Sequence, residues 1–220
     1  MKHSPHTDRQ KRIRLRRLRR MSLLALIFVL PTALLVWLIV RPDLPSAEEL
    51  GLPDWVSVDL LPINEYSRPG TKLDAVRGLV IHYVGNPGTS AQQNHSYFES
   101  LAKTGETYAS SNFLIGLEGE VLLNVPPDEV AYCSNSRNSD TLSIECCHPR
   151  ADGAFTDATY DSLVRLTAFL MNAYDLKRED VIRHYDVTGK LCPVYFVEHP
   201  EQWEAFLDEA EQAARELSQS

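Results

Sequence analysis

The sequence predicts an α/β domain with a central mixed β-sheet flanked by helices, preceded by one transmembrane helix. The domain is predicted because short apolar runs rich in β-branched residues alternate along the chain with longer amphipathic stretches. That order is typical of a sheet covered by helices. The transmembrane helix is predicted because residues 21–40 form an apolar run without a charged side chain.

The N-terminal part favours an uncleaved membrane anchor. Residues 21–40 are long enough, since a helix needs about 20 mostly apolar residues to cross a bilayer core of about 30 Å. A cleaved signal peptide has an apolar region of about 7–15 residues and ends at small residues. This run instead continues into Arg-Pro-Asp. Secretion after signal cleavage stays as the alternative.

Charge sets the expected orientation and excludes one class of partner. Residues 1–20 form a basic tail, and residues 1–41 carry ten Lys and Arg against one acid. The positive-inside rule therefore predicts a cytoplasmic N-terminus and a single-pass protein of the cell membrane whose domain lies outside the cell. Residues 42–220 carry twelve Lys and Arg against twenty-nine acids. Such an acidic domain is a poor nucleic-acid binder, because phosphate contacts need basic side chains.

Residues 41–54 are rich in Pro and acids and are expected to be a linker, so that the folded domain covers residues 55–220. Apolar runs typical of strands or extended segments occur at residues 55–63, 77–85, 111–126 (a hairpin), 129–133, 141–147 and 181–187. Helical patterns occur at residues 90–104, with Ser90 as the N-cap, 156–175 and 200–217. The sequence does not indicate an oligomeric state.

Three residues of the types that bind zinc fall in or near these predicted segments. The stretch RHYDVTGKLCP contains His184 and Cys192, and the run LVIHYV contains His82. Catalytic zinc sites use three such ligands and leave a position for water. The residues alone also allow a packed core histidine at position 82, a cysteine hydrolase that uses Cys192 with His184, or an ordinary loop.

Glu145 lies inside the apolar run LSIECC. A carboxylate in such a run is normally excluded from the interior unless it is paired or has a function. A solvated strand face would also accommodate it. If a zinc site is present, a neighbouring glutamate is a familiar general base.

The four cysteines, Cys133, Cys146, Cys147 and Cys192, all lie in the part expected outside the cell, where disulfides are permitted. Adjacent strand residues point to opposite faces, so Cys147 is expected on the face of Glu145 and Cys146 in the opposite core. A disulfide between Cys133 and Cys147 is a hypothesis that follows from this alternation.

Four separated stretches, GLVIHYVGNPGTSAQQNHSYFES, SSNFLIGLEGEV, NSDTLSIECCHP and RHYDVTGKLCP, resemble the type 2 N-acetylmuramoyl-L-alanine amidases. This family includes phage endolysins, bacterial autolysins and peptidoglycan recognition proteins. The resemblance covers roughly residues 56–207, and the four motifs occur in the family's order. It implies a central mixed sheet with helices around it and a zinc ion in a surface cleft.

The resemblance also implies roles for individual residues. His82, His184 and Cys192 match the family's zinc ligands, Glu145 matches the glutamate that activates the water on the zinc, and Lys190 matches a basic residue that stabilises the transition state.

The implied substrate is peptidoglycan, cut between N-acetylmuramic acid and L-alanine on the cell-wall side of the membrane. A peptidoglycan-binding module without activity stays as an alternative, as does the cysteine hydrolase. The chain departs from the family at Asn112 and Cys133, where histidines are frequent.

Overall fold

A six-stranded mixed sheet with the order β1-β4-β3-β5-β2-β6 forms the centre of the computed structural model, which describes residues 43–219. Only β3 and β4 pair antiparallel; every other neighbouring pair runs parallel. The strands are β1 (Val56–Val58), β2 (Leu79–Tyr83), β3 (Phe113–Ile115), β4 (Val121–Leu123), β5 (Leu142–Cys146) and β6 (Val181–Arg183). The predicted α/β fold with a mixed sheet is confirmed.

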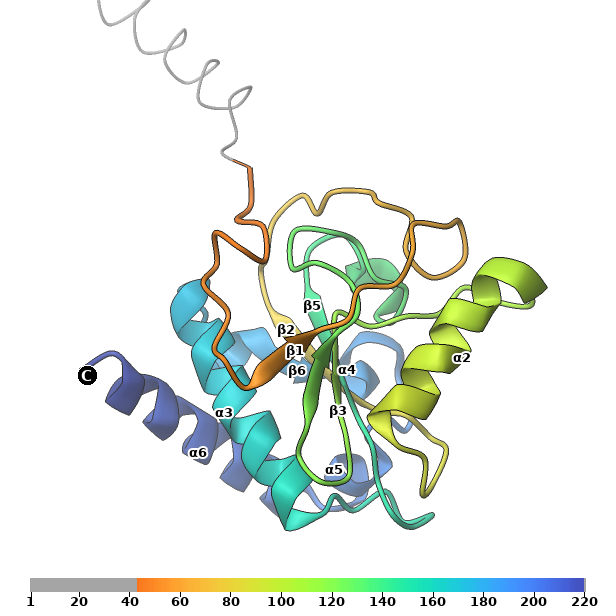
Figure 1. Ribbon diagram of the computed structural model, residues 1–220. Coiled ribbons are helices and arrows are strands. Elements are labelled where there is room, and N and C mark those ends of the chain that lie inside the picture. Colours follow the sequence, from red (N-terminus) through yellow and green to blue (C-terminus); the bar gives the residue numbers. More distant parts are fainter. Residues whose placement is uncertain (1–42, 220) are drawn as a thin grey trace, which may run out of the picture. The chain divides into compact units, whose positions relative to one another are not determined.

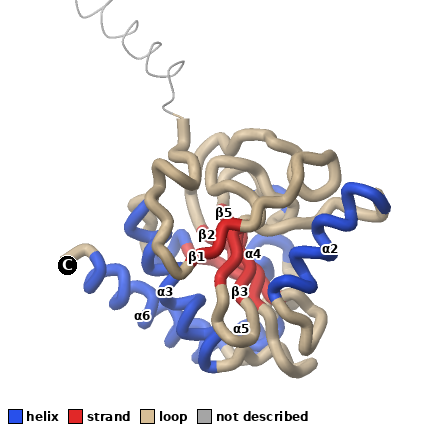
Figure 2. The backbone as a smooth tube through the Cα atoms, in the orientation of Figure 1, coloured by secondary structure: helices blue, strands red, loops and turns tan. Residues whose placement is uncertain are grey.

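Helices cover both faces of the sheet (Figures 1 and 2). Helices α3 (Asp157–Ala173) and α6 (Pro200–Leu217) pack side by side over one face, and α2 (Ala91–Thr104) lies over the other. The alternation of strand residues builds a core under each layer. Ile115 packs in the larger core beneath α3 and α6, whereas its neighbour Leu114 packs in the smaller core beneath α2.

Helix α2 begins and ends at residues that are typical helix caps, Ser90 and Gly105. The Ser90 hydroxyl accepts a hydrogen bond from the Gln93 backbone N–H, and the Gln93 side chain accepts one from the Ser90 backbone N–H. This reciprocal capping box satisfies two donors that a helix start leaves free. Gly105 ends the helix with φ 61°, a left-handed conformation that glycine adopts without steric cost. The predicted helix and its N-cap are confirmed.

Two predicted strands differ from the structure. Residues 129–133 form no strand; Glu129 makes only an isolated bridge with Lys72. The predicted extended segment at 181–187 is β6 followed by a short helix, α4 (His184–Thr188). The chain turns into α4 because the Asp186 carboxylate accepts a hydrogen bond from the Arg183 backbone N–H at 2.8 Å, which caps the helix start. A second short helix, α5 (Val194–Glu198), and two 3-10 turns, η1 (Asn135–Arg137) and η2 (Arg178–Asp180), have no counterpart in the prediction.

The segment expected as a linker at 41–54 packs from Leu44 onward. Leu44, Ala47 and Leu52 are partly buried against the larger core, since these apolar side chains find a surface beside the helices. The compact unit thus begins about ten residues before the expected domain start.

The predicted membrane localisation is corrected. Among residues 43–219 there is no helix with the length and apolar character needed to span a bilayer. This finding contradicts the description as a single-pass membrane protein. Residues 21–40, on which that prediction and the basic tail's orientation depended, lie outside the described residues. The described residues therefore give no support to membrane anchoring through an N-terminal helix.

Replacing Ser90 by Ala removes the capping hydroxyl, and we expect Ser90→Ala to lower the free energy of unfolding by about 1 kcal/mol. Urea denaturation measures this change. Ser96→Ala is the matched control, since Ser96 is exposed in the interior of the same helix, where alanine is the better helix former. Equal stability of Ser90→Ala and wild type would contradict the role of the cap.

Candidate functional site

Three neighbouring parallel strands end at one edge of the sheet, and each places a functional side chain there. Strand β2 lies between β5 and β6 and runs parallel to both. His82 on β2 and Glu145 on β5 are direct register partners, and His184 follows the last residue of β6. The carboxyl ends of parallel strands are where open α/β sheets bind ligands. Residues about a hundred positions apart in the sequence therefore meet.

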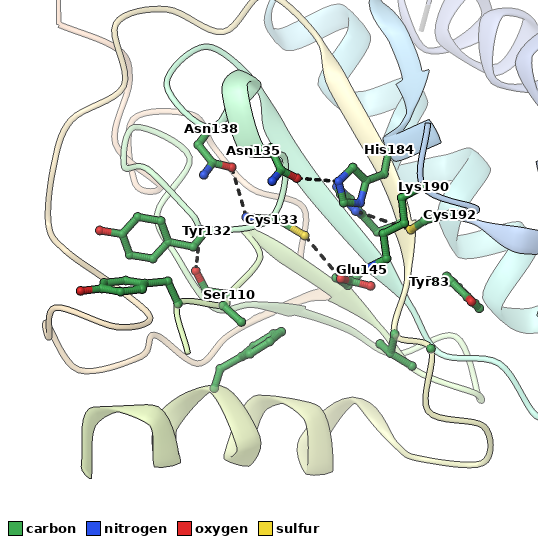
Figure 3. A pocket seen from close by; sticks show the side chains of 16 residues that line it. Tyr83, Ser110, Tyr132, Cys133, Asn135, Asn138, Glu145, His184, Lys190 and Cys192 are labelled. Atoms are coloured by element: carbon green, nitrogen blue, oxygen red, sulfur yellow. Dashed lines mark hydrogen bonds between the residues drawn. The ribbon is translucent and has the colours of Figure 1, made fainter. Parts of the chain in front are cut away.

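Cys192 joins them through the loop after α4. Gly189 ends α4 with φ 79°, and the chain then turns back so that the Tyr185 N–H donates to the Cys192 carbonyl at 2.9 Å. The Cys192 thiol is buried, with its Sγ 3.8 Å from His82 Nδ1. The sulfur and the first histidine are thus neighbours, and Figure 3 shows Cys192 in the same pocket as Glu145 and His184.

Arg183, just before His184, ties this loop to the C-terminal helices. Its guanidinium pairs with Asp186 at 2.8 Å and donates to the Phe196 carbonyl at 3.1 Å. It also lies over the Trp203 ring of α6, 5.3 Å from the ring centroid. Asp186 therefore serves the turn and the arginine rather than the ring of His184.

The buried residues His82, His184 and Cys192 form a compact donor group. One possible ligand atom from each lies within 4.8 Å of the others, and the two imidazole ring centroids are 4.7 Å apart. Burial lowers the pKa of both histidines, so each ring is neutral near pH 7 and has a free lone pair. Two imidazoles and a thiol match the donors that zinc prefers.

The protonation state of the Cys192 thiol depends on whether a cation lies beside it. Burial raises the pKa of Cys192 to about 12, although Lys190 acts in the opposite direction. Without a nearby cation this sulfur stays a neutral thiol at pH 7, and a metal ion is the usual agent that deprotonates a thiol of this kind. The donor set therefore fits a zinc ion.

Glu145 lies beside this group, and its carboxyl group has a raised pKa. Burial raises its pKa to about 7, while the Cys133 thiol and Lys190 act to lower it. The Cys133 thiol donates to Oε1 at 3.4 Å, and Oε2 is buried without a hydrogen-bond partner among residues 43–219. A carboxyl group with a pKa near 7 can both accept and return a proton.

These side chains line a cleft of about 700 Å³ (Figure 3). Lys190 lies exposed at the cleft, and its positive charge acts on both histidines, Glu145 and Cys192. Aromatic side chains line another part, where Tyr108 packs edge-on against Tyr132 with centroids 5.4 Å apart. The cleft thus has a polar region around the histidines and an aromatic region beside it.

The positions at which the chain departs from the family motif have different roles. Asn112 is buried and donates to the carbonyls of Val125, Pro126 and Glu129, so it fixes the backbone and does not face the cleft. Cys133 does line the cleft, against Glu145.

The disulfide hypothesis is wrong. Each of the four cysteines has a free thiol. Cys133 is directed to Glu145, whereas Cys147 lies near α2, with its sulfur 3.6 Å from the Asn94 side-chain nitrogen. The two sulfurs therefore have different neighbours, and Cys146 lies in the opposite core, as the strand alternation predicts.

Several cleft residues escape the sequence reasoning. Asn135 and Asn138 belong to a stretch of short turns without periodicity, and Tyr108 lies in a loop whose position depends on distant contacts. Only Cys133, in the family's histidine position, gave a signal in this region.

Comparisons with known proteins find relatives of one family. A family model described as N-acetylmuramoyl-L-alanine amidase (Amidase_2) matches residues 72–195. A protein described as a probable N-acetylmuramoyl-L-alanine amidase from Bacillus licheniformis is 33% identical over 156 residues, which cover 66% of this chain and 44% of that protein. The amidase BlyA of Bacillus subtilis (strain 168) is 29% identical over 167 residues, with 66% of this chain and 44% of that protein covered. The chain spans less than half the length of these relatives.

Solved structures share the fold. The catalytic domain of XlyA superposes with a TM-score of 0.60 at 24% identity, covering 70% of this chain and 98% of that one. PlyL gives a TM-score of 0.61 at 18% identity, covering 71% and 96%. At these identities the likeness concerns the fold alone, and it supports the sheet and helix arrangement described above.

We expect four reactive thiols per chain when the protein is unfolded without reductant, because every cysteine is free. Titration with a chromogenic disulfide reagent in denaturant measures them, and the same titration after reduction is the control. A count of two would show that one disulfide is present and would contradict the expectation.

Proposed function

This chain belongs to the N-acetylmuramoyl-L-alanine amidase family, and we propose that it hydrolyses the amide bond between N-acetylmuramic acid and the L-alanine of the peptidoglycan stem peptide. The observation that carries the proposal is the meeting of His82, His184, Cys192 and Glu145 in one cleft. We assign the activity to residues 55–220, the domain that holds these side chains.

His82, His184 and Cys192 would hold a zinc ion. Their donor atoms lie close together, both imidazoles are neutral near pH 7, and burial alone disfavours the thiolate that a metal ion would stabilise. When bound, zinc supplies Lewis acidity toward the scissile carbonyl and lowers the pKa of a coordinated water to roughly 7.

Glu145 would act as general base and then as general acid. Its pKa of about 7 suits both directions of transfer. One carboxylate oxygen would take the proton of the attacking water. The same proton would then pass to the nitrogen of L-alanine, so that the amine leaves in neutral form as the carbon–nitrogen bond breaks.

Lys190 would stabilise the negative charge that develops on the carbonyl oxygen. Its ammonium is exposed at the cleft and already influences every titratable group of the site named above. A positive charge in this place is effective because the groups that it faces are buried, where charge interactions are stronger than in bulk water.

The alternatives are supported less well. A cysteine hydrolase needs a reactive thiolate, yet burial raises the pKa of Cys192 to about 12. A binding module without activity needs neither Glu145 nor Lys190 in the cleft, and this chain has both.

Glu145→Gln should abolish the proton transfer while it leaves the metal donors in place. We expect the turnover number to fall by about 10²–10⁴-fold with unchanged zinc content. Mass spectrometry of the peptides released from purified peptidoglycan, with metal analysis of the same sample, measures both. Glu118→Gln, an exposed change in the β3–β4 turn, is the control. Substantial hydrolysis by Glu145→Gln would remove Glu145 from the mechanism.

Cys192→Ser should strongly lower the zinc content, because a serine hydroxyl is a poor zinc ligand. Cys192→Asp should recover part of it, since a carboxylate binds zinc and replaces the thiolate charge. Zinc per chain after dialysis against a weak chelator is the measurement. Full zinc retention in Cys192→Ser would remove Cys192 from the ligand set. If thiol alkylation of the wild type also abolished activity and chelation did not, the cysteine hydrolase would be favoured.

A further inference from the structure

The short turn that contains Ser134 and Asn135 lies against both histidines of the cleft, and Figure 3 shows the contact of Asn135 with His184. The turn follows Tyr132 and leads into the 3-10 turn η1, whose first residue is Asn135. Neither Ser134 nor Asn135 is of a residue type that usually binds zinc. Their side chains nevertheless form hydrogen bonds with the two rings.

Asn135 determines which nitrogen of His184 carries hydrogen. Its side-chain oxygen lies 2.7 Å from His184 Nε2. An amide oxygen only accepts hydrogen bonds, so Nε2 must carry the hydrogen and donate it. The other nitrogen, Nδ1, is then a free lone pair, which is the form of imidazole that binds a metal ion.

Ser134 makes the corresponding contact with His82, but its hydroxyl can donate as well as accept, so it holds the ring without fixing the tautomer. The hydroxyl oxygen lies 3.1 Å from His82 Nε2, and both side chains are almost fully buried, at 1% exposure each. The opposite nitrogen, Nδ1, faces the Cys192 sulfur at 3.8 Å. In both histidines, therefore, Nε2 is held by the turn and Nδ1 is left for another partner.

The turn itself is fixed by Asn138. Its side-chain oxygen accepts from the backbone N–H of Cys133 at 3.2 Å and of Ser134 at 2.6 Å. Asn135 has φ 51°, in the left-handed region that asparagine tolerates better than most residues. Consecutive residues of an extended chain point to opposite sides. This left-handed residue interrupts that alternation, and both side chains reach histidines of one site.

We propose that Ser134 and Asn135 are positioning residues of the metal site. They hold His82 and His184 in the ring orientation that directs Nδ1 of each toward the space beside Cys192, and Asn135 also fixes the tautomer of His184. The proposal rests on the proposed function only in taking these residues as metal ligands. Hydrogen-bond partners of metal-binding histidines typically contribute about 10–100-fold to metal affinity.

The decisive variant is Asn135→Gly. Glycine adopts a positive φ freely, so the backbone is preserved and only the side-chain acceptor is lost. We expect the zinc dissociation constant to rise by about 10–100-fold. Asn135→Asp keeps an acceptor at a position where φ is positive and should restore most of the affinity. Competition of the full chain with a chromophoric chelator gives these constants.

Ser136→Ala is the matched control. Ser136 is exposed in the same 3-10 turn, and its side chain makes no hydrogen bond within residues 43–219. Its zinc affinity should equal that of wild type. Ser134→Ala should weaken zinc through the other histidine.

A second measurement does not depend on metal or activity. Nitrogen NMR of the metal-free protein should find His184 as a single tautomer with hydrogen on Nε2 in wild type and in Ser136→Ala. In Asn135→Gly the ring should become a mixture of tautomers. A structural role without contact to the ring would leave this spectrum unchanged.

The outcomes separate this inference from the proposed function. Unchanged zinc affinity and an unchanged tautomer in Asn135→Gly would overturn the inference even if wild type is an active amidase. So would a rise in KM alone, which would make Asn135 a substrate contact. Loss of zinc affinity in Asn135→Gly, with a wild type that binds zinc but releases no stem peptide, would support the inference and reject the function.

Discussion

The parallel pairing of β2 with β5 on one side and β6 on the other is the constraint on which the site depends. Its register sets His82 opposite Glu145 and ends β6 immediately before His184. A slip of one residue would turn His82 away from the cleft and into the core beneath α3 and α6. The apolar contacts that prevent such a slip lie on the other face, where Ile81 and Ile144 are fully buried. The larger core therefore determines the geometry of the cleft, although the two lie on opposite faces of the sheet.

Burial gives the cleft its chemical character. The same removal from water lowers the pKa of the two histidines and raises the pKa of Glu145 and Cys192. Each shift favours the neutral form, so the metal-free site carries little charge apart from Lys190. A divalent cation would reverse this balance for the sulfur, since it stabilises the thiolate that burial disfavours. Burial therefore favours neutral donor groups and gives Glu145 a pKa of about 7.

Residue type and local pattern were sufficient to predict much of the fold and the candidate site. The apolar run around His82, the capping residues of α2 and the stripe of α3 predicted their elements, and the site residues followed from their chemistry and from the family motifs. The sequence could not reveal that residues 129–133 lack a strand partner, because pairing is a tertiary property. It could not reveal Asn135 either, whose importance comes from a contact with His184, 49 positions away. The disulfide hypothesis failed because alternation states which face a cysteine shares, not how far apart two sulfurs lie.

Arg183 connects the cleft to the C-terminal helices through Asp186, the Phe196 carbonyl and the Trp203 ring. Neither Phe196 nor Trp203 lines the cleft. Anyone who transplants this candidate site into another scaffold would still have to include both of them. A graft limited to the residues that line the cleft would lose the contacts that hold Arg183 next to His184. The smallest set of residues that would preserve this arrangement is therefore larger than the cleft, and it extends to α6.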